Sequence, residues 1–542
     1  MVKSQRAVLL GPNQQENLAL QYLASAAVEA GHAVELVGYN DRRDLDSAVL
    51  AALAHEPDLI GIGIPFQYCI GDALLLAQTL RDKGFRGHLT CGGHVPTFCY
   101  TELLRDAPFD SVVRHEAEDS FVEMLDALGR GQTVSGIAGL VWRKGDGVET
   151  GPCRAPSRDI DRLPWPRRGD APYIVAGVPV AFIVTARGCT GECHYCSIKA
   201  FSRSAGGPPF RMRTPESVAD EVAFLYHERD ARIFFVQDDL FVLMNETATL
   251  KRVEAMRVAC AERGVTDAAW WVKGRPETIT PAVVDAMKEL GVLHVFIGLE
   301  NASEDRLIYL GRTHKPKHNR RAIDVCAERG MLVSFNFMIF DPDCTVDDVE
   351  ITLDFADECV GMPWNLCRTE VYSGTGLLEK LRLEERLLGD YRSYGYIMKD
   401  HRAELMFRIL RVALHERAFA FDSLMNRLIS LSFGRQVHQR FFPGPGTDRL
   451  AAEVKELMGI VHRDTIGICR EALAYVRRAD LHDNAGARRF AVELALAAGE
   501  RDLPWHKQAV RAWERANARG MTMLGHLDKV QAPQFNQVLS FS

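Results

Sequence analysis

The sequence lacks any long apolar run. No window of its 542 residues approaches the roughly 20 continuous apolar residues that a membrane-spanning helix needs. Its first residues, MVKSQRAVLLGPN, lack the charged region, apolar core and small-residue cleavage site of a secretory signal. We therefore expect a cytoplasmic protein that has no membrane partner.

The sequence also lacks a strong excess of charge of one sign. The 65 basic and 72 acidic residues leave a formal net charge of -7, and the basic residues are dispersed among the acidic ones. A nucleic-acid partner is therefore not expected. No internal repeat of fixed period interrupts the chain, and its length favours two or three ordinary domains.

Cysteines are grouped in one place only. Of the 13 cysteines, Cys189, Cys193 and Cys196 fall within the stretch RGCTGECHYCSIKA. Disulfides are rare in a reducing cytoplasm, and a structural zinc site normally wants four ligands with paired two-residue spacings. Unconnected buried cysteines are a further alternative. Three thiolates are also able to hold three irons of a [4Fe–4S] cluster, which leaves the fourth iron open to a substrate or cosubstrate.

The first part of the chain alternates strand and helix patterns. Strands are predicted at 7–11, 33–39, 58–65, 87–93 and 111–116, with helical patterns between them. This alternation predicts an α/β fold with a doubly wound, Rossmann-like parallel sheet, in which ligands bind at the carboxyl ends of the strands. We assign this domain to residues 1–138 and a Pro- and Arg-rich linker to 139–178.

The alternation resumes after the linker. Strands are predicted at 181–186, 233–239, 270–277, 294–300, 332–342 and 365–372, each next to a helical pattern. Six repeats suit a partial barrel and fall short of the eight of a closed one. Beyond about residue 378 the patterns are almost wholly helical. We expect a partial (β/α)6 barrel over 179–385 and a helical C-terminal domain over 386–542.

Three cysteines after the first strand of such a barrel resemble the motif of the radical S-adenosylmethionine (SAM) superfamily, and Tyr195 before the last cysteine also fits. The resemblance implies a [4Fe–4S] cluster on Cys189, Cys193 and Cys196. It also implies SAM contacts at the ends of the next strands, from Asp238, Lys273, Arg275 and Glu300. Asp239 is the alternative to Asp238, and each of these charged residues alone could simply be solvated.

One turn departs from the pattern of this superfamily. Many members carry Gly-x-Pro-Gly-x-Thr after the fifth strand, where this chain has FDPDCT at 340–345. Asp341, Pro342 and Thr345 still suit a turn beside SAM.

The first domain resembles the cobalamin-binding domain that precedes the barrel in one large subfamily of these enzymes. The resemblance implies that the following residues, after its strands, contact cobalamin: Asn13, Gln14, Pro65, Phe66, Gln67, Gly92, Gly93, His94, Arg114 and Glu116. Doubly wound domains also bind nucleotides and flavins, which is the alternative. The motif Asp-Xaa-His-Xaa-Xaa-Gly is absent, so no histidine is expected to ligate cobalt from below, and the loop 65–69 is expected near that face.

The resemblance implies transfer of a methyl group from SAM, through methylcobalamin, to a carbon or another poorly reactive centre of a small molecule or natural product. An external electron donor such as flavodoxin or ferredoxin is implied as a partner. Other members of the subfamily perform ring contraction or cyclisation, and a tryptophan methyltransferase is thought to work without the adenosyl radical. A radical SAM enzyme without a corrin and a non-enzymatic cobalamin or redox sensor are the rival classes.

Overall fold

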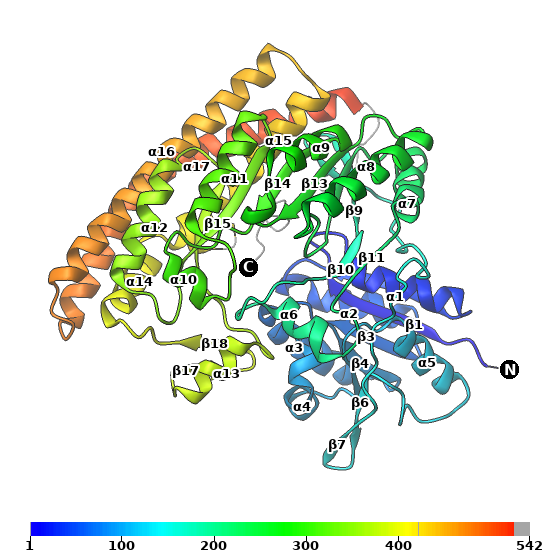
Figure 1. Cartoon of the computed structure of the whole chain (residues 1–542). Coiled ribbons are helices and arrows are strands. Elements are labelled where there is room, and N and C mark those ends of the chain that lie inside the picture. Colours follow the sequence, from blue (N-terminus) through cyan, green and yellow to red (C-terminus); the bar gives the residue numbers. More distant parts are fainter. Residues whose placement is uncertain (1, 421, 525–542) are drawn as a thin grey trace. The chain divides into compact units, whose positions relative to one another are not determined.

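The computed structural model describes residues 2–420 and 422–524 and divides into two compact units (Figure 1). Unit 1 contains the residues up to 170 together with 186–217 and 371–395, and unit 2 contains 171–185, 218–370 and the residues from 396 on. Neither unit is one continuous stretch of chain. The domain boundaries expected after residues 138, 178 and 385 stay a prediction.

Unit 1 is built on a seven-stranded sheet in the order β2-β1-β3-β4-β5-β6-β7. The strands are β1 (Arg6–Pro12), β2 (Ala33–Tyr39), β3 (Leu59–Gly63), β4 (His88–Gly92), β5 (Ser111–Val113), β6 (Leu140–Lys144) and β7 (Gly147–Thr150). The first five pair in parallel, and β6 and β7 continue the sheet antiparallel. The predicted doubly wound sheet is confirmed, and its strand order reverses between β1 and β3.

Helices cover both faces of this sheet. They are α1 (Leu18–Glu29), α2 (Leu45–Ala54), α3 (Ile70–Asp82), α4 (Pro96–Asp106) and α5 (Glu118–Gly129), with short 3-10 turns at Arg42–Asp44 and Gln67–Cys69. One core cluster joins the sheet to α2, α3 and α4, and a second joins it to α1 and α5. Because both faces are buried, the central strands are almost continuously apolar.

A second segment of unit 1 carries the three cysteines. Strands β10 (Ala186–Gly188) and β11 (Phe210–Met212) form an antiparallel hairpin, and the loop between them contains the cysteines and α6 (Ser197–Ser204). The third segment contains α13 (Gly376–Leu383) and β17 (Leu387–Asp390), which pairs with β18 (Ser393–Tyr396). The cysteine loop thus lies in the same compact unit as the first sheet.

Unit 2 contains the expected partial barrel. Its strands lie in the order β16-β15-β14-β13-β12-β9-β8, and six of them are parallel and follow one another in sequence order. They are β8 (Tyr173–Val175), β9 (Val178–Ile183), β12 (Ile233–Val236), β13 (Ala269–Gly274), β14 (Val292–Ile297), β15 (Leu332–Phe340) and β16 (Trp364–Arg368). The intervening helices are α7 (Pro215–Glu228), α8 (Glu246–Glu262), α9 (Pro281–Leu290), α10 (Glu304–Tyr309), α11 (Pro316–Glu328) and α12 (Val346–Glu358), with a 3-10 turn at Pro276–Thr278.

The C-terminal part of unit 2 is helical, as predicted. It comprises α14 (His401–Ala413), a short π-helix at His415–Phe419, α15 (Leu424–Phe441), α16 (Pro445–Arg478) and α17 (Asn484–Leu524). Helix α15 packs on the barrel strands, since the ring of Phe433 lies 5.3 Å from that of Phe235 and 5.6 Å from that of His294.

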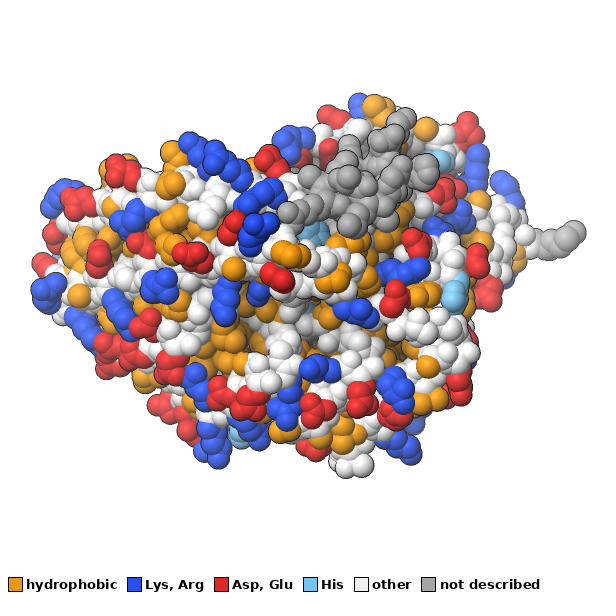
Figure 2. Space-filling view, turned by 90° about the horizontal axis from the view of Figure 1, so that it is seen from above, with side chains coloured by type: hydrophobic (Ala, Val, Ile, Leu, Met, Phe, Trp, Pro, Cys, Tyr) orange, Lys and Arg blue, Asp and Glu red, His pale blue; other side chains and the backbone are white. Residues whose placement is uncertain are grey.

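None of the helices in the described residues is long and apolar enough to cross a membrane. Figure 2 shows basic and acidic side chains interspersed over the face in view.

A buried ion network ties these helices together. The guanidinium of Arg417 is fully buried and contacts the carboxylates of Asp464 at 2.6 Å and Asp502 at 2.8 Å. Breaking a buried pair leaves an uncompensated charge, whereas exposed pairs contribute little.

Arg417→Ala should therefore lower the free energy of unfolding by about 3 kcal/mol or more. Arg470→Ala is the control, because its contacts with Asp354 and Asp357 are about half exposed and their loss should cost under about 1 kcal/mol. Denaturant unfolding followed by circular dichroism measures both. Equal losses would contradict the role given to the buried network.

Candidate functional site

Four loops of the first sheet lie at one edge. Because β1, β3, β4 and β5 are parallel, the residues that follow them emerge at the same carboxyl edge. These are Asn13 and Gln14 after β1, Pro65 to Gln67 after β3, Gly92 to His94 at the end of β4, and Arg114 to Glu116 after β5. The structure therefore brings all ten residues expected to contact cobalamin to the edge at which such sheets bind ligands.

Several of these side chains already bind other parts of unit 1. Gln14 donates to the carbonyl of Asn40, and the Gln67 amide donates to the carbonyl of Val371 at 3.0 Å and accepts from the amide of Tyr394 at 2.8 Å. The Arg114 guanidinium lies 4.9 Å from the centre of the Tyr100 ring. The edge is thus a set of mutually connected loops.

Gly93 permits a close approach of two of these loops. Its φ angle is +121°, and a Cβ atom at this position would lie 2.8 Å from the carbonyl oxygen of Ile64. Glycine is the residue that combines a positive φ with this separation. The loops after β3 and β4 are therefore held together through backbone.

Buried polar atoms at this edge fit an amide-rich ligand. The hydroxyl of Tyr39, the Oε1 atom of Gln15 and the Nε atom of Arg114 are buried and make no hydrogen bond. Buried polar groups in native proteins normally have partners. Corrin carries several amide side chains that both donate and accept hydrogen bonds, so these residues fit cobalamin.

The cysteine loop has the chemistry that a cluster needs. Cys193 is buried, and Cys189 and Cys196 are half-buried. Cys196 is the N-cap of α6, where the helix dipole favours a thiolate. Within residues 2–420 and 422–524, no three His, Cys, Asp or Glu side chains converge as ligands of one metal ion. A [4Fe–4S] cluster does not require such convergence, since each thiolate binds a different iron.

The cysteine loop adjoins the carboxyl edge of the first sheet. The ring of His94 stacks on that of Phe201 in α6, with centres 4.1 Å apart and planes 2° from parallel. Burial lowers the pKa of His94 to about 4, so the ring is neutral near pH 7. On the other side, the amide of Leu377 donates to the carbonyl of His194 at 3.1 Å. A cluster in this loop therefore lies beside a ligand bound at the sheet edge.

The two carboxylates after β12 have different surroundings. Asp238 is buried and accepts hydrogen bonds from the backbone amide of Thr185 at 2.7 Å and from its hydroxyl. Asp239 is half-buried and lies in a bend that follows the strand. Burial lowers the pKa of Lys273, and the charge of Asp239 opposes this more than that of Asp238. Asp239 and Lys273 are both half-buried at this rim, whereas Asp238 is buried.

Arg275 and Glu300 bind one neighbouring segment. Arg275 contacts Glu277 at 2.8 Å and donates to the hydroxyl of Thr313 at 3.0 Å. Glu300 has a positive φ of 65° and lies 3.5 Å from Arg312. Both residues lie at the barrel rim as expected. Each of them already forms an ion pair with another side chain of the protein, Arg275 with Glu277 and Glu300 with Arg312.

The unusual turn after β15 starts a helix. Thr345 and Asp348 form a capping box at the start of α12. Asp341 is fully buried and contacts Arg306 at 3.3 Å. Burial raises the pKa of Asp341 to about 6, and Arg306 opposes the rise. The first part of this turn thus carries a buried carboxylate, and its end is the helix cap.

Two family models match the chain in the same order as the two sheets. The model of the radical SAM superfamily matches residues 183–356, and that of the B12 binding domain matches residues 11–125. This chain is a radical SAM protein. Its B12-binding domain precedes the radical SAM domain. The radical SAM domain implies a [4Fe–4S] cluster and SAM as cofactors, and the B12-binding domain implies cobalamin.

Curated relatives of this radical SAM protein include methyltransferases. The uncharacterized methyltransferase PH0819 of Pyrococcus horikoshii is 29% identical over 408 residues, which cover 73% of this chain and 86% of the relative. The hopanoid C-3 methylase of Methylococcus capsulatus is 24% identical over 399 residues, covering 70% and 71%. An anaerobic magnesium-protoporphyrin IX monomethyl ester cyclase of Rubrivivax gelatinosus is 27% identical over 290 residues, covering 51% and 48%.

Solved structures share the fold. The cobalamin-dependent radical enzyme OxsB with aqua-cobalamin bound has a TM-score of 0.64 at 14% identity, covering 95% of this chain and 85% of that one. The methyltransferase TsrM from Kitasatospora setae, with cobalamin and a [4Fe–4S] cluster bound, has a TM-score of 0.58 at 18% identity, covering 70% and 75%.

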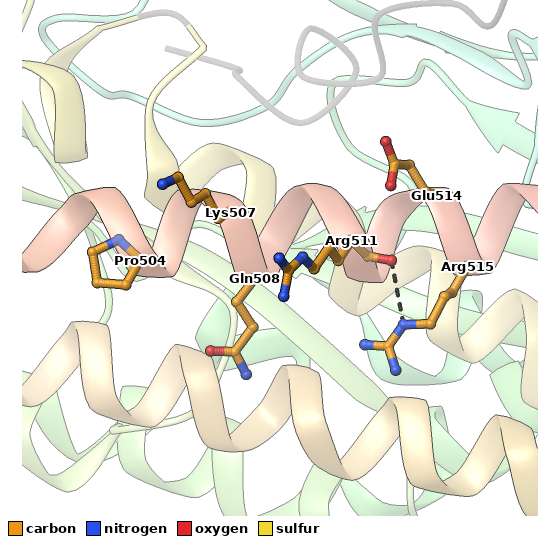
Figure 3. Close-up of a pocket in the computed structure, with 6 residues that line it drawn as sticks. All are labelled: Pro504, Lys507, Gln508, Arg511, Glu514 and Arg515. Carbon is orange, nitrogen blue, oxygen red and sulfur yellow. Dashed lines mark hydrogen bonds between the residues drawn. The ribbon is translucent and has the colours of Figure 1, made fainter.

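A surface hollow on α17 lies apart from the predicted site residues in the sequence. It is lined by Pro504, Lys507, Gln508, Arg511, Glu514 and Arg515 (Figure 3). All six belong to one helix, and the Nε atom of Arg515 donates to the carbonyl of Arg511 at 3.3 Å. None of the residues expected to bind a cofactor lines this hollow, and we assign no cofactor to it.

Gly93→Ala should lower the free energy of unfolding by about 2 kcal/mol, because the new methyl group meets the Ile64 carbonyl in a strained backbone conformation. Gly131→Ala is the matched control, since Gly131 also has a positive φ, of 67°, but faces open space. Its cost should be about 1 kcal/mol. Denaturant unfolding distinguishes them, and equal costs would contradict the close approach of the two loops.

Proposed function

We propose that this protein is a cobalamin-dependent radical SAM methyltransferase that transfers a methyl group from SAM, through cobalamin, to a carbon of a small molecule. The observation that supports this most is the stack of His94 on Phe201, because it joins the cysteine loop to the carboxyl edge of the B12-binding sheet inside one compact unit. Two relatives that cover most of this chain are named methyltransferase or methylase. A carbon centre as acceptor is suggested by the hopanoid C-3 methylase.

In this proposal Cys189, Cys193 and Cys196 hold the cluster. The cofactors, when bound, supply radical formation and methyl carriage. The loop supplies thiolates and partial burial, and the N-terminus of α6 stabilises the negative charge of Cys196. Exclusion of water from Cys193 protects the ligand that lies deepest in the loop.

Asp239 and Lys273 are the side chains that we propose to orient SAM. The methionine part of SAM carries an ammonium and a carboxylate, and the Asp239 carboxylate and the Lys273 ammonium at the barrel rim have the complementary charges. Asp238 instead fixes Thr185 after β9. Arg275 and Glu300 line the same rim and contribute their remaining donor and acceptor capacity.

An external reductant is part of the proposal. The cluster must receive an electron, and a flavodoxin or ferredoxin is the class of donor that we expect. Three cysteines clustered in one loop suit a reducing compartment, where disulfides are rare, so we propose a cytoplasmic location.

A second candidate function is cyclisation of the substrate. It rests on the similarity to the Rubrivivax gelatinosus cyclase, which covers about half of each chain. Incubation of the reconstituted protein with SAM labelled in its methyl group separates the two. Label on the corrin and then on an organic acceptor supports methyl transfer, whereas products of SAM cleavage with no label on the corrin contradict it.

Cys193→Ala should abolish cluster binding, because only two thiolates of the motif remain. The anaerobically reconstituted protein should lose nearly all of its roughly four irons per chain, as measured by iron analysis and absorbance. Cys153→Ala is the control, since Cys153 is exposed and outside the motif. A variant that keeps its full iron would contradict the assignment of the cluster.

Asp239→Asn should weaken SAM binding about tenfold or more, because a charge-assisted contact to the ammonium is lost. Asp238→Asn should leave SAM affinity close to that of the wild type and lower the free energy of unfolding by about 1–3 kcal/mol, since it perturbs a buried hydrogen-bonded carboxylate. Isothermal titration with the reconstituted protein measures the affinities. The reverse order of affinities would assign the contact to Asp238.

A further inference from the structure

The carboxylate of Glu116 joins both strands of the cysteine hairpin. It accepts from the Nη1 atom of Arg187 in β10 at 3.1 Å and from the Nη1 atom of Arg211 in β11 at 3.0 Å. The exposed fractions of the three side chains are 20% for Glu116, 16% for Arg187 and 4% for Arg211. This is a buried, bridging ion cluster and not a surface pair.

The two arginines mark the base of the cysteine loop. Arg187 and Arg211 are direct partners across the β10–β11 ladder, so the loop that leaves this pair contains all three cysteines and α6. Arg187 also contacts Glu118 at 2.7 Å, and Arg211 donates to the carbonyl of Ser157 at 3.0 Å. The carboxylate of Glu116 is therefore the partner that the two ends of the loop share.

Glu116 itself is held by the sheet edge. It follows β5 and His115, which has a positive φ of 60° and whose amide donates to the hydroxyl of Thr97 at 2.9 Å. Burial raises the pKa of Glu116, but Arg211 and Arg187 together lower it by more than burial raises it. The pKa therefore lies below its usual value, and the carboxylate is charged near pH 7. The sheet edge after β5 thus sets the position of the Glu116 carboxylate, and the carboxylate in turn contacts the β10–β11 hairpin.

We propose that Glu116 is a positioning residue that sets the separation between the cluster and the corrin, rather than a contact to cobalamin. This inference rests on the proposed function, because it needs both cofactors. The carboxylate oxygens of Glu116 accept hydrogen bonds from the two arginines that flank the cysteine loop. Small displacements of reacting groups change reaction rates strongly. The ion cluster of Glu116 with Arg187 and Arg211 at the base of the loop therefore controls the geometry of the reaction.

The test is the magnetic coupling between the two cofactors. In the full-length protein, reconstituted with iron, sulfide and cobalamin, the paramagnetic reduced cluster speeds the relaxation of cob(II)alamin to an extent that depends steeply on their distance. The variants are Glu116→Gln, which removes the charge, and Glu116→Asp, which keeps the charge on a shorter side chain. Pulsed electron paramagnetic resonance measures the coupling, and corrin titration measures affinity in the same samples.

Asp119→Asn is the matched control. Asp119 also joins this domain to the linker, through Arg162 at 2.7 Å, but both side chains are more than two-fifths exposed. It should leave coupling and affinity unchanged, since exposed pairs contribute little. Thermal unfolding of each variant shows whether the chain is folded before the coupling is compared.

Glu116→Gln should bind corrin with wild-type affinity and show a weakened or broadened coupling, and Glu116→Asp should recover part of it. A fall in corrin affinity of about tenfold or more with unchanged coupling would overturn the proposal and make Glu116 a contact to cobalamin. Unchanged coupling and affinity would also overturn it. A wild-type protein that binds no corrin would instead contradict the proposed function, and so the two failures are distinguishable.

Discussion

Parallel pairing of the strands decides where the functional residues of this protein lie. It delivers the ends of β1, β3, β4 and β5 to one edge of the first sheet and the ends of the barrel strands to one rim of the second. Functional residues that are distant in the sequence thereby lie close together at one edge of each sheet. The loops at each edge then only have to select which side chains face a ligand and which hold the loops together.

That division of roles could be predicted only in part. The two sheets, the six parallel strands and the edge at which candidate residues gather follow from periodicity and the cysteine motif, because these are local signals. Asp238 and Asp239 are adjacent in the sequence, and the choice between them depends on the hydrogen bonds of Thr185.

The roles of Gln67 and Glu116 could not be read from the sequence. Both belong to loops at the expected edge, but their partners lie far along the chain, at Val371, Arg187 and Arg211. Long-range ion pairs and hydrogen bonds leave no periodic signal. For the same reason the sequence does not reveal that residues 186–217 and 371–395 join the first sheet in one compact unit.

The proposed chemistry requires that one chain hold a cluster and a corrin side by side. The most direct test is to reconstitute the wild-type protein without oxygen, remove unbound cofactors, and count corrin and iron per chain. We expect one corrin together with about four irons per chain. Four irons without corrin would contradict it, since the first sheet would then serve another ligand while the barrel remained a radical SAM domain.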